Sequence, residues 1–386
     1  MRRRHEFAGH ISRAETAGHP YLYVPFEVPP RCTRIEVAYH YAPAQPTAED
    51  ATLDIGIFDI RGTEPFTGGF RGWSGSDRRQ FFIEYGRATP GYVAGPLPSG
   101  TWSVVLGAYE IPEDGLRYWL TVSLEVAVRE DVGLPPPREV APASVRPASG
   151  GPGWYRGDLH SHTEHSDGEN TIAEMAHFAK SRRLDFLAIT DHNTTTHMPE
   201  IDAWRAPWKF TDPGFRVREV WQAPWRWYNW ESVGKYDEEL ATGRRIVPVG
   251  GSDAHSAPPA QPRHPHHVGD PTTLVWCAGG LSEAAVLEGI REGRTAISDG
   301  PDGPLVWLEQ SADGIVTAHF RGAEGTTLEF IADGERQLRL ETPADAGSLA
   351  VPASVRFDRY LRAELRTEAP KGREDVRGLS APVYRD

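Results

Sequence analysis

Cysteine and lysine are scarce in this chain of 386 residues, and long apolar runs are missing. Its two cysteines, Cys32 and Cys277, cannot form a disulfide framework, and neither belongs to a motif with metal-binding spacing. A reducing, cytoplasmic location fits this composition. Because lysine is so rare, arginine carries nearly all of the positive charge, which we attribute to genomic base composition.

The missing apolar runs and the charge balance exclude further classes of protein. No stretch reaches the roughly eighteen apolar residues that a membrane-spanning helix needs. The basic start, Met1–His5, is not followed by an apolar segment, so no signal peptide is expected. The formal net charge of -13 argues against a nucleic-acid backbone as partner.

The N-terminal region, residues 1–132, has the alternation of apolar and polar residues that is typical of β-strands. Gly, Pro and Asp separate the runs, and no helical period interrupts them. This pattern predicts a jelly-roll-like β-sandwich. We expect a scaffold, with sugar binding as the alternative. The predicted strands are Tyr21–Val28, Thr33–Tyr39, Thr52–Phe58, Gln80–Ile83, Gly100–Gly107 and Trp119–Leu124.

Two further regions are defined by composition. Residues 133–153 are rich in Pro and Gly, which predicts a linker. Residues 303–386 return to a β pattern, and Ala332–Glu335 is typical of a hairpin turn. This C-terminal region resembles a small immunoglobulin-like sandwich with a structural role. Its predicted strands are Val306–Glu309, Val316–Phe320, Thr327–Ile331 and Tyr360–Arg366.

In the central region, residues 154–302, three short apolar runs lead into possible metal ligands. Runs of this length are typical of buried strands in a parallel sheet, where chemistry is found at the carboxyl ends of the strands. We therefore expect the three strand ends to meet. Tyr155–Leu159 leads into His160 and His162, Leu184–Ile189 into His192, and Ile246–Val249 into Asp253 and His255.

The residue types at these strand ends suit a transition metal. Neutral imidazole and carboxylate are ligands for zinc, manganese or iron(II). His160 and His162 are two apart in an extended segment, so both side chains leave on the same side. Asp253 and His255 repeat this spacing. The chain has 15 histidines, and one such pair could arise by chance, but three strand ends with ligands argue for a metal site.

Helices and loops complete the central region. Thr171 and Glu174 form a capping box before an apolar stripe at helical spacing. A second helix is predicted over Glu231–Thr242 and a third after Ser282. The aromatic stretch Pro199–Trp230 is either a wall over the metal pocket or rigid loop packing. A Pro-rich loop carries His264, His266 and His267, and His264 is an additional candidate ligand.

These motifs resemble those of the PHP (polymerase and histidinol phosphatase) superfamily. Within it the chain is similar to CehA/McbA-type metallohydrolases, from about Trp154 to Ser298. The resemblance rests on His160-Ser161-His162-Thr163, Ser166-Asp167-Gly168, Thr190-Asp191-His192-Asn193 and Gly251-Ser252-Asp253-Ala254-His255. It implies a distorted (β/α)7 barrel with a di- or trinuclear hydrolytic centre. It also implies a first metal held by His160, His162 and Asp253, and a second held by Asp167, His192 and His255.

The chain departs from the family pattern between His192 and Asp253. The bridging Glu and two further His of the family have no counterpart there. Glu219, in the possible strand Val217–Trp221, either replaces the bridging carboxylate or is a strand-face residue paired with Arg. A seven-unit barrel needs roughly 210 residues, and the region supplies about 147, so we expect a truncated barrel.

The sequence thus predicts a metal-dependent hydrolase, with two divalent ions and a metal-activated water in place of a catalytic side chain. The family resemblance implies a small-molecule phosphoester as substrate. The alternatives are a carbamate or carboxylic ester hydrolase of the CehA type, and a degenerate module that binds a metal or ligand without turnover. We predict no membrane partner and make no prediction of the oligomeric state.

Overall fold

The computed structural model describes residues 1–16, 18–47, 49–63, 68–127, 150–192, 194, 196–197, 216–256, 267–369 and 373–385. The chain forms two compact units. The first comprises Met1–Ser144, His162–Ile172 and Asp191–Arg205. The second comprises Val145–Ser161, Ala173–Thr190 and Ala206–Asp386. The predicted linker and its flanking boundaries stay a prediction, because most of residues 133–153 are outside the described ranges.

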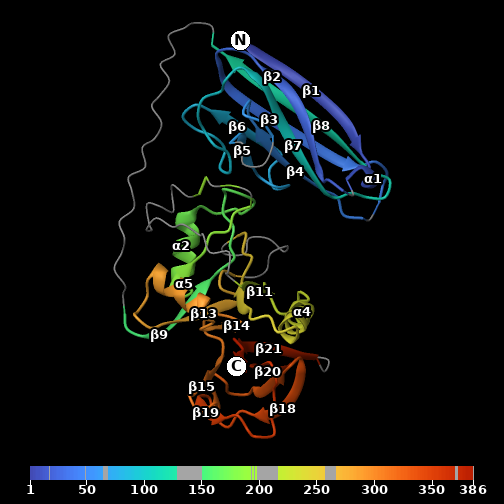
Figure 1. Cartoon of the computed structure of the whole chain (residues 1–386). Helices are drawn as coiled ribbons and strands as arrows, with labels where there is room; N and C mark the ends of the chain where they lie inside the picture. The colour runs from blue at the N-terminus through green and yellow to red at the C-terminus, as the bar shows by residue number, and fades with distance from the viewer. Residues whose placement is uncertain are drawn as a thin grey trace. The chain divides into compact units, whose positions relative to one another are not determined.

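The N-terminal part of the first unit consists of two antiparallel sheets of four strands (Figure 1). A short helix, α1 (Arg13–Thr16), follows the first strand. One sheet has the order β1 (Arg2–Ile11), β8 (Leu116–Val126), β3 (Cys32–Pro43) and β6 (Gln80–Glu84). The other has the order β2 (Tyr21–Val28), β7 (Gly100–Glu110), β4 (Thr52–Phe58) and β5 (Phe70–Trp73).

The period-two alternation produces the core of this sandwich. In β3, Ile35 and Val37 are completely buried, whereas their neighbours along the strand are partly exposed. The inward residues of both sheets form one apolar cluster, to which Ile55 and Leu106 contribute from the second sheet. All six predicted strands are present, which confirms the β-rich pattern. The basic N-terminus is itself a strand, β1, paired with β8, and the sequence analysis missed it.

The central region contributes strands to a nine-stranded sheet of the second unit. Among the described strands there are two parallel pairs, and each contains a strand that leads into the candidate ligands. β9 (Gly153–Asp158) pairs with β10 (Phe186–Leu187), and β11 (Val217–Gln222) pairs with β12 (Val247–Gly251). From β9 the large sheet continues through β13 (Thr272–Cys277) and β14 (Thr295–Ser298).

The expectation of a parallel barrel is only partly met. β13 runs antiparallel to both of its neighbours, β9 and β14. The strands of the described ranges form several sheets and no closed barrel. The sequence prediction failed here because a short apolar run indicates a buried strand but not its direction. The central region is therefore a mixed α/β region, rich in strands, that contains the PHP-like motifs.

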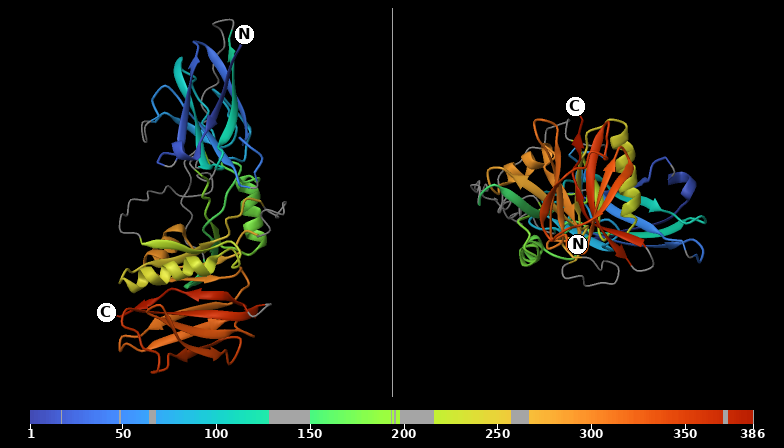
Figure 2. Two further views of the ribbon diagram at one scale, coloured as in Figure 1. Left: turned by 90° about the vertical axis from the view of Figure 1, so that its right-hand side faces the viewer. Right: turned by 90° about the horizontal axis from the view of Figure 1, so that it is seen from below.

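The described part of the central region has three helices beside these strands. α2 (Ile172–Ser181) begins directly after Thr171, the first residue of the predicted capping box, and Glu174 lies in its first turn. α4 (Asn229–Ala241) buries Val233, Tyr236 and Leu240 and packs on β11 (Figure 2). α5 (Glu283–Arg291) is capped by Ser282, whose hydroxyl accepts a hydrogen bond from the Ala285 amide. None of the described helices is long and apolar enough to cross a membrane.

The C-terminal region forms a second sandwich, whose larger sheet is continuous with the central region. β14 pairs with β21, so the large sheet extends into the C-terminal strands. Leu328, Phe330 and Leu365 of this sheet pack with Val316 and Phe320 of the smaller one. The large sheet continues as β21 (Arg373–Ser380), β20 (Tyr360–Ala369), β17 (Thr327–Ala332) and β18 (Glu335–Glu341), with β22 (Val383–Tyr384) beside β20. The small sheet has β15 (Leu305–Gln310), β16 (Val316–Arg321) and β19 (Gly347–Ala350).

Candidate metal centre

The carboxylate of Asp158, at the end of β9, holds the candidate ligand segments of the second unit together. This side chain is completely buried. Its Oδ1 accepts hydrogen bonds from the amides of His160 (3.1 Å) and Ser252 (2.9 Å), and its Oδ2 accepts one from the amide of Gly269 (2.7 Å). Burial raises the pKa of Asp158 above its ordinary value, and these hydrogen bonds only partly offset that effect. One carboxylate therefore positions both the segment of His160 and the segment of Asp253.

His160 lies between two carboxylates. Its Nδ1 is 2.9 and 3.0 Å from the two carboxylate oxygens of Glu219 on β11. Its Nε2 is 3.4 Å from Oδ1 of Asp253. Burial alone lowers the pKa of His160, but the hydrogen bond and charge of Glu219, with the charge of Asp253, raise it above its usual value. A carboxylate on Nδ1 orients the ring and leaves Nε2 as the ligand atom.

Asp253 has a backbone conformation that few non-glycine residues adopt, with φ of 54°. Its amide donates to the carbonyl of His160 (2.9 Å), and Gln222 donates to its Oδ2 (2.7 Å). Two residues further on, Nδ1 of His255 is 2.8 Å from the carbonyl oxygen of Asp253. Strained backbone held by several hydrogen bonds is characteristic of functional sites, because the surroundings must compensate its cost.

In the first unit, Asp191 holds the loop that carries Asp167. One of its oxygens accepts hydrogen bonds from the Thr163 amide and the Ser166 hydroxyl, each 2.7 Å long. The other accepts one from the Thr163 hydroxyl, also 2.7 Å. His197 adds a contact of 3.3 Å from its Nδ1 to the same oxygen. Asp191 directly precedes His192, so one residue positions two candidate ligands.

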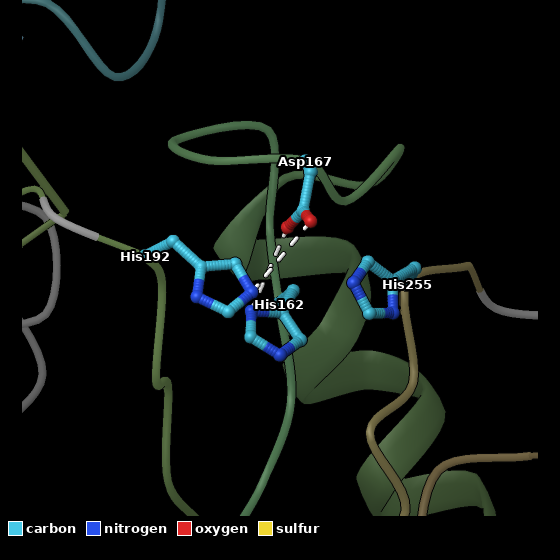
Figure 3. Close-up of side chains that lie close together, drawn as sticks. All are labelled: His162, Asp167, His192 and His255. Carbon is cyan, nitrogen blue, oxygen red and sulfur yellow. Dashed lines mark ion pairs between the residues drawn. The ribbon is translucent and has the colours of Figure 1, made fainter. Parts of the chain in front are cut away.

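The side chains of His162, Asp167 and His192 converge (Figure 3). The imidazole rings of His162 and His192 are stacked, with centroids 4.4 Å apart and an interplanar angle of 17°. The carboxylate of Asp167 faces both, at 3.7 Å from Nδ1 of His162 and 3.6 Å from Nε2 of His192. His162 is completely buried, whereas about half of the His192 side chain is exposed.

Among the residues that the structure describes, two groups of side chains have ligand atoms within 4.8 Å of one another. One contains His160, His162 and Asp253, which is the set that the family resemblance assigns to the first metal. The other contains Asp167, His192 and His255, the set assigned to the second metal, together with His162. All six predicted ligands thus occur in these groups. Glu219 is in neither group and is paired with His160 instead of an arginine. His264 is outside the described residues.

The residues fit a divalent transition metal by the chemistry of their donors. Each group combines imidazole nitrogens with carboxylate oxygen, which is the ligand set of zinc, manganese and iron(II). Each also has polar partners that orient the ligands, namely Glu219, Gln222 and Asp191. The sequence analysis missed the roles of Gln222 and Asp191. The Thr-Asp-His motif could have identified Asp191. No sequence pattern marks Gln222, because its partner Asp253 is 31 residues away.

Comparison with protein-family models found a match over part of the region that contains the candidate ligands. Residues 158–240 match the family model of the PHP domain. No curated protein matches the chain. A solved structure from Bacteroides vulgatus ATCC 8482, of a two-domain protein described as containing a predicted PHP-like metal-dependent phosphoesterase, is similar at 13% identity. The match covers 64% of this chain and 99% of that one, with a TM-score of 0.27, and this value is too low to inform on the fold.

Proposed function

We propose that this protein is a metal-dependent phosphoesterase that acts on a small-molecule substrate with two divalent ions. The observation that carries the proposal is the pair of ligand groups, which together contain His160, His162, Asp167, His192, Asp253 and His255. The match of residues 158–240 to the PHP domain supports the same chemistry. The finer assignment to the CehA/McbA type rests on the motifs quoted above.

The side chains of the chain have separate tasks in this proposal. The first group would hold one ion through Nε2 of His160, which Glu219 orients through Nδ1. The second would hold another through Asp167, which lies beside His162 and His192. Ions held by these residues would supply Lewis-acid activation of a water molecule and of the ester oxygen. Asp158 and Asp191 keep the ligand segments in place before any substrate arrives.

The first experiment is elemental analysis of the purified chain, followed by hydrolysis assays. We expect about two equivalents of Zn, Mn or Fe, and hydrolysis of p-nitrophenyl phosphate faster than that of a p-nitrophenyl carbamate or acetate. Asp167→Ala should lower kcat/KM by about a hundredfold or more, because a metal ligand is lost. Asp302→Ala is a suitable control, since its side chain is 60% exposed and distant in sequence from the ligands.

Each contrary outcome points to one alternative. Preferential cleavage of the carbamate or acetate would indicate the CehA-like activity in place of phosphoester hydrolysis. Bound metal without turnover of any ester would indicate a degenerate, ligand-binding module. An unchanged rate in Asp167→Ala would exclude the proposed site.

A further inference from the structure

A cavity of about 670 Å3 lies in the second unit, lined by α4, the chain just before it and the strands β17, β18 and β20. Figure 2 shows α4 beside these C-terminal strands. None of the lining residues belongs to the candidate metal groups. The volume of the cavity is within the range of sites for small organic ligands, roughly 300–1,000 Å3.

The charged side chains that line this cavity are all ion-paired within the described part of the chain. Each of the three lining arginines contacts at least one carboxylate, at 2.5 to 3.2 Å. The pairs join Arg336, Arg362 and Arg366 with Asp237, Glu329 and Glu364. An ionic ligand would have to compete with one of these ion pairs, whereas a neutral ligand would not. The charges therefore favour a neutral ligand.

One face of α4 leaves open space at the cavity. Trp230, Gly234 and Asp237 follow one another at intervals of four and three residues, so they lie on the same face of the helix, and all three line the cavity. A Cβ at Gly234 would meet no atom within 4 Å, so packing gives no reason for a glycine here. Helix stability gives none either, because only proline disfavours a helix more than glycine. The missing side chain keeps the cavity open.

The two residues on either side of Gly234 offer complementary contacts. The indole of Trp230 is 44% exposed, although large aromatic side chains normally bury most of their surface, and it presents a flat apolar face. The carboxylate of Asp237 accepts at Oδ1 from Arg362 (2.7 Å) and from the hydroxyl of Tyr360 (2.9 Å), and at Oδ2 from Arg362 (2.6 Å). Among the described residues Oδ2 has this single donor, so it retains the capacity to accept a further hydrogen bond.

We propose that this cavity binds a neutral sugar in its pyranose form. A pyranose ring has a flat face of C–H groups, which matches the indole of Trp230, and a rim of hydroxyl groups, which can donate to Oδ2 of Asp237. A wholly apolar ligand would bury the polar groups of the lining without new hydrogen bonds, which is unfavourable. The site is separate in its residues from the phosphoesterase proposal and does not depend on it.

Isothermal titration calorimetry on the full chain, with EDTA present to keep the metal centre empty, tests the proposal. The probes are the methyl pyranosides of glucose, galactose and mannose, together with sorbitol, which has hydroxyl groups but no ring, and glucuronate, which adds a negative charge to the ring. We expect at least one methyl pyranoside to bind about tenfold or more tightly than sorbitol, because sorbitol cannot stack. Glucuronate should bind no more tightly than that pyranoside, since its charge must compete with an ion pair.

Matched variants locate the binding. Trp230→Ala should weaken it by about tenfold, since the stacking surface is lost. Its control is Trp227→Ala, because Trp227 is 45% exposed but does not line the cavity. Gly234→Leu should fill the open space and weaken binding by about tenfold or more, without lowering the unfolding temperature, because leucine favours a helix more than glycine. Its control is Glu238→Leu, at an exposed position of α4 outside the cavity lining.

Three outcomes would overturn the proposal. The first is that none of the three pyranosides binds at concentrations of tens of millimolar. The second is that sorbitol binds as tightly as the best pyranoside, or glucuronate more tightly. The third is that Trp230→Ala and Gly234→Leu bind that pyranoside as tightly as their controls do.

Discussion

Glu219 and His160 are paired across 59 residues of sequence, with both carboxylate oxygens of Glu219 within 3.0 Å of Nδ1 of His160. A carboxylate at this position orients an imidazole for a metal and increases its basicity. We therefore predict that Glu219→Gln lowers the affinity for the divalent metal about 10- to 100-fold, measured by competition with a chelator. Glu238→Gln, an exposed change on α4, should leave the affinity unchanged. Equal affinities in the two variants would contradict the role of Glu219.

We predict that Asp158→Asn lowers both the stability of the protein and its metal binding. In Asp158→Asn the amide has only one oxygen, so it cannot accept from His160 and Ser252 on one side and Gly269 on the other. Leaving a buried amide unsatisfied costs about 1–3 kcal/mol, and we expect the free energy of unfolding to fall by about that amount. Urea denaturation measures it, with Asp302→Asn as the exposed control. A wild-type unfolding curve for Asp158→Asn would show that the three hydrogen bonds are dispensable.

We predict that a side chain at position 251, in place of Gly251, has a steric effect on His160. A Cβ at Gly251 would lie 2.3 Å from Cβ of His160 and 2.6 Å from its amide nitrogen, which is closer than such atoms approach. Gly251→Ala must therefore displace the His160 segment, and we expect a loss of about 1–3 kcal/mol in stability and a weaker metal site. The matched control is Gly279→Ala, because a Cβ there meets no atom within 4 Å. The idea fails if both variants bind metal as tightly as the wild type.

Asp333 is not among the candidate metal ligands, and we predict that it makes the stability of the protein depend on pH. Its carboxylate accepts hydrogen bonds from the amides of Asp358, Arg359 and Tyr360 at 2.7 to 3.0 Å. Burial raises its pKa, but these hydrogen bonds outweigh that effect and hold the pKa below the ordinary value of 3.8. The stabilisation is therefore present above pH 3.8 and is lost as the pH falls through the lowered folded pKa.

Asp333→Asn isolates this contribution. Asn tolerates the positive φ of 52° at this position, so the hairpin turn is retained. At pH 7 the variant should be less stable by about 1 kcal/mol, and the difference should shrink as the pH falls below 3.8. Thermal unfolding at several pH values measures the difference. A gap between the two proteins that is constant from pH 7 to pH 3 would contradict the assignment.

Local patterns in the sequence were sufficient for most of the secondary structure. The alternation in Tyr21–Val28 and Thr52–Phe58 predicted strands with the bounds that the structure has. The hairpin at Asp333 and Gly334, both with positive φ, followed from its turn residues. These features depend on neighbours along the chain, so the residue pattern contains the necessary information. β1 was missed because its arginines concealed a strand in which alternate residues are less exposed.

The sequence by itself also determined the chemistry of the candidate centre. Imidazole and carboxylate at the ends of three apolar runs indicated a metal, and the six residues occur in the two ligand groups of the structure. Only the tertiary structure decided that β13 runs antiparallel, that Glu219 faces His160, and that Trp230 and Arg336 line one cavity. The physical reason is that strand direction and distant pairing depend on how the chain returns to the sheet. Segments far apart in sequence determine that path together, and no local pattern records it.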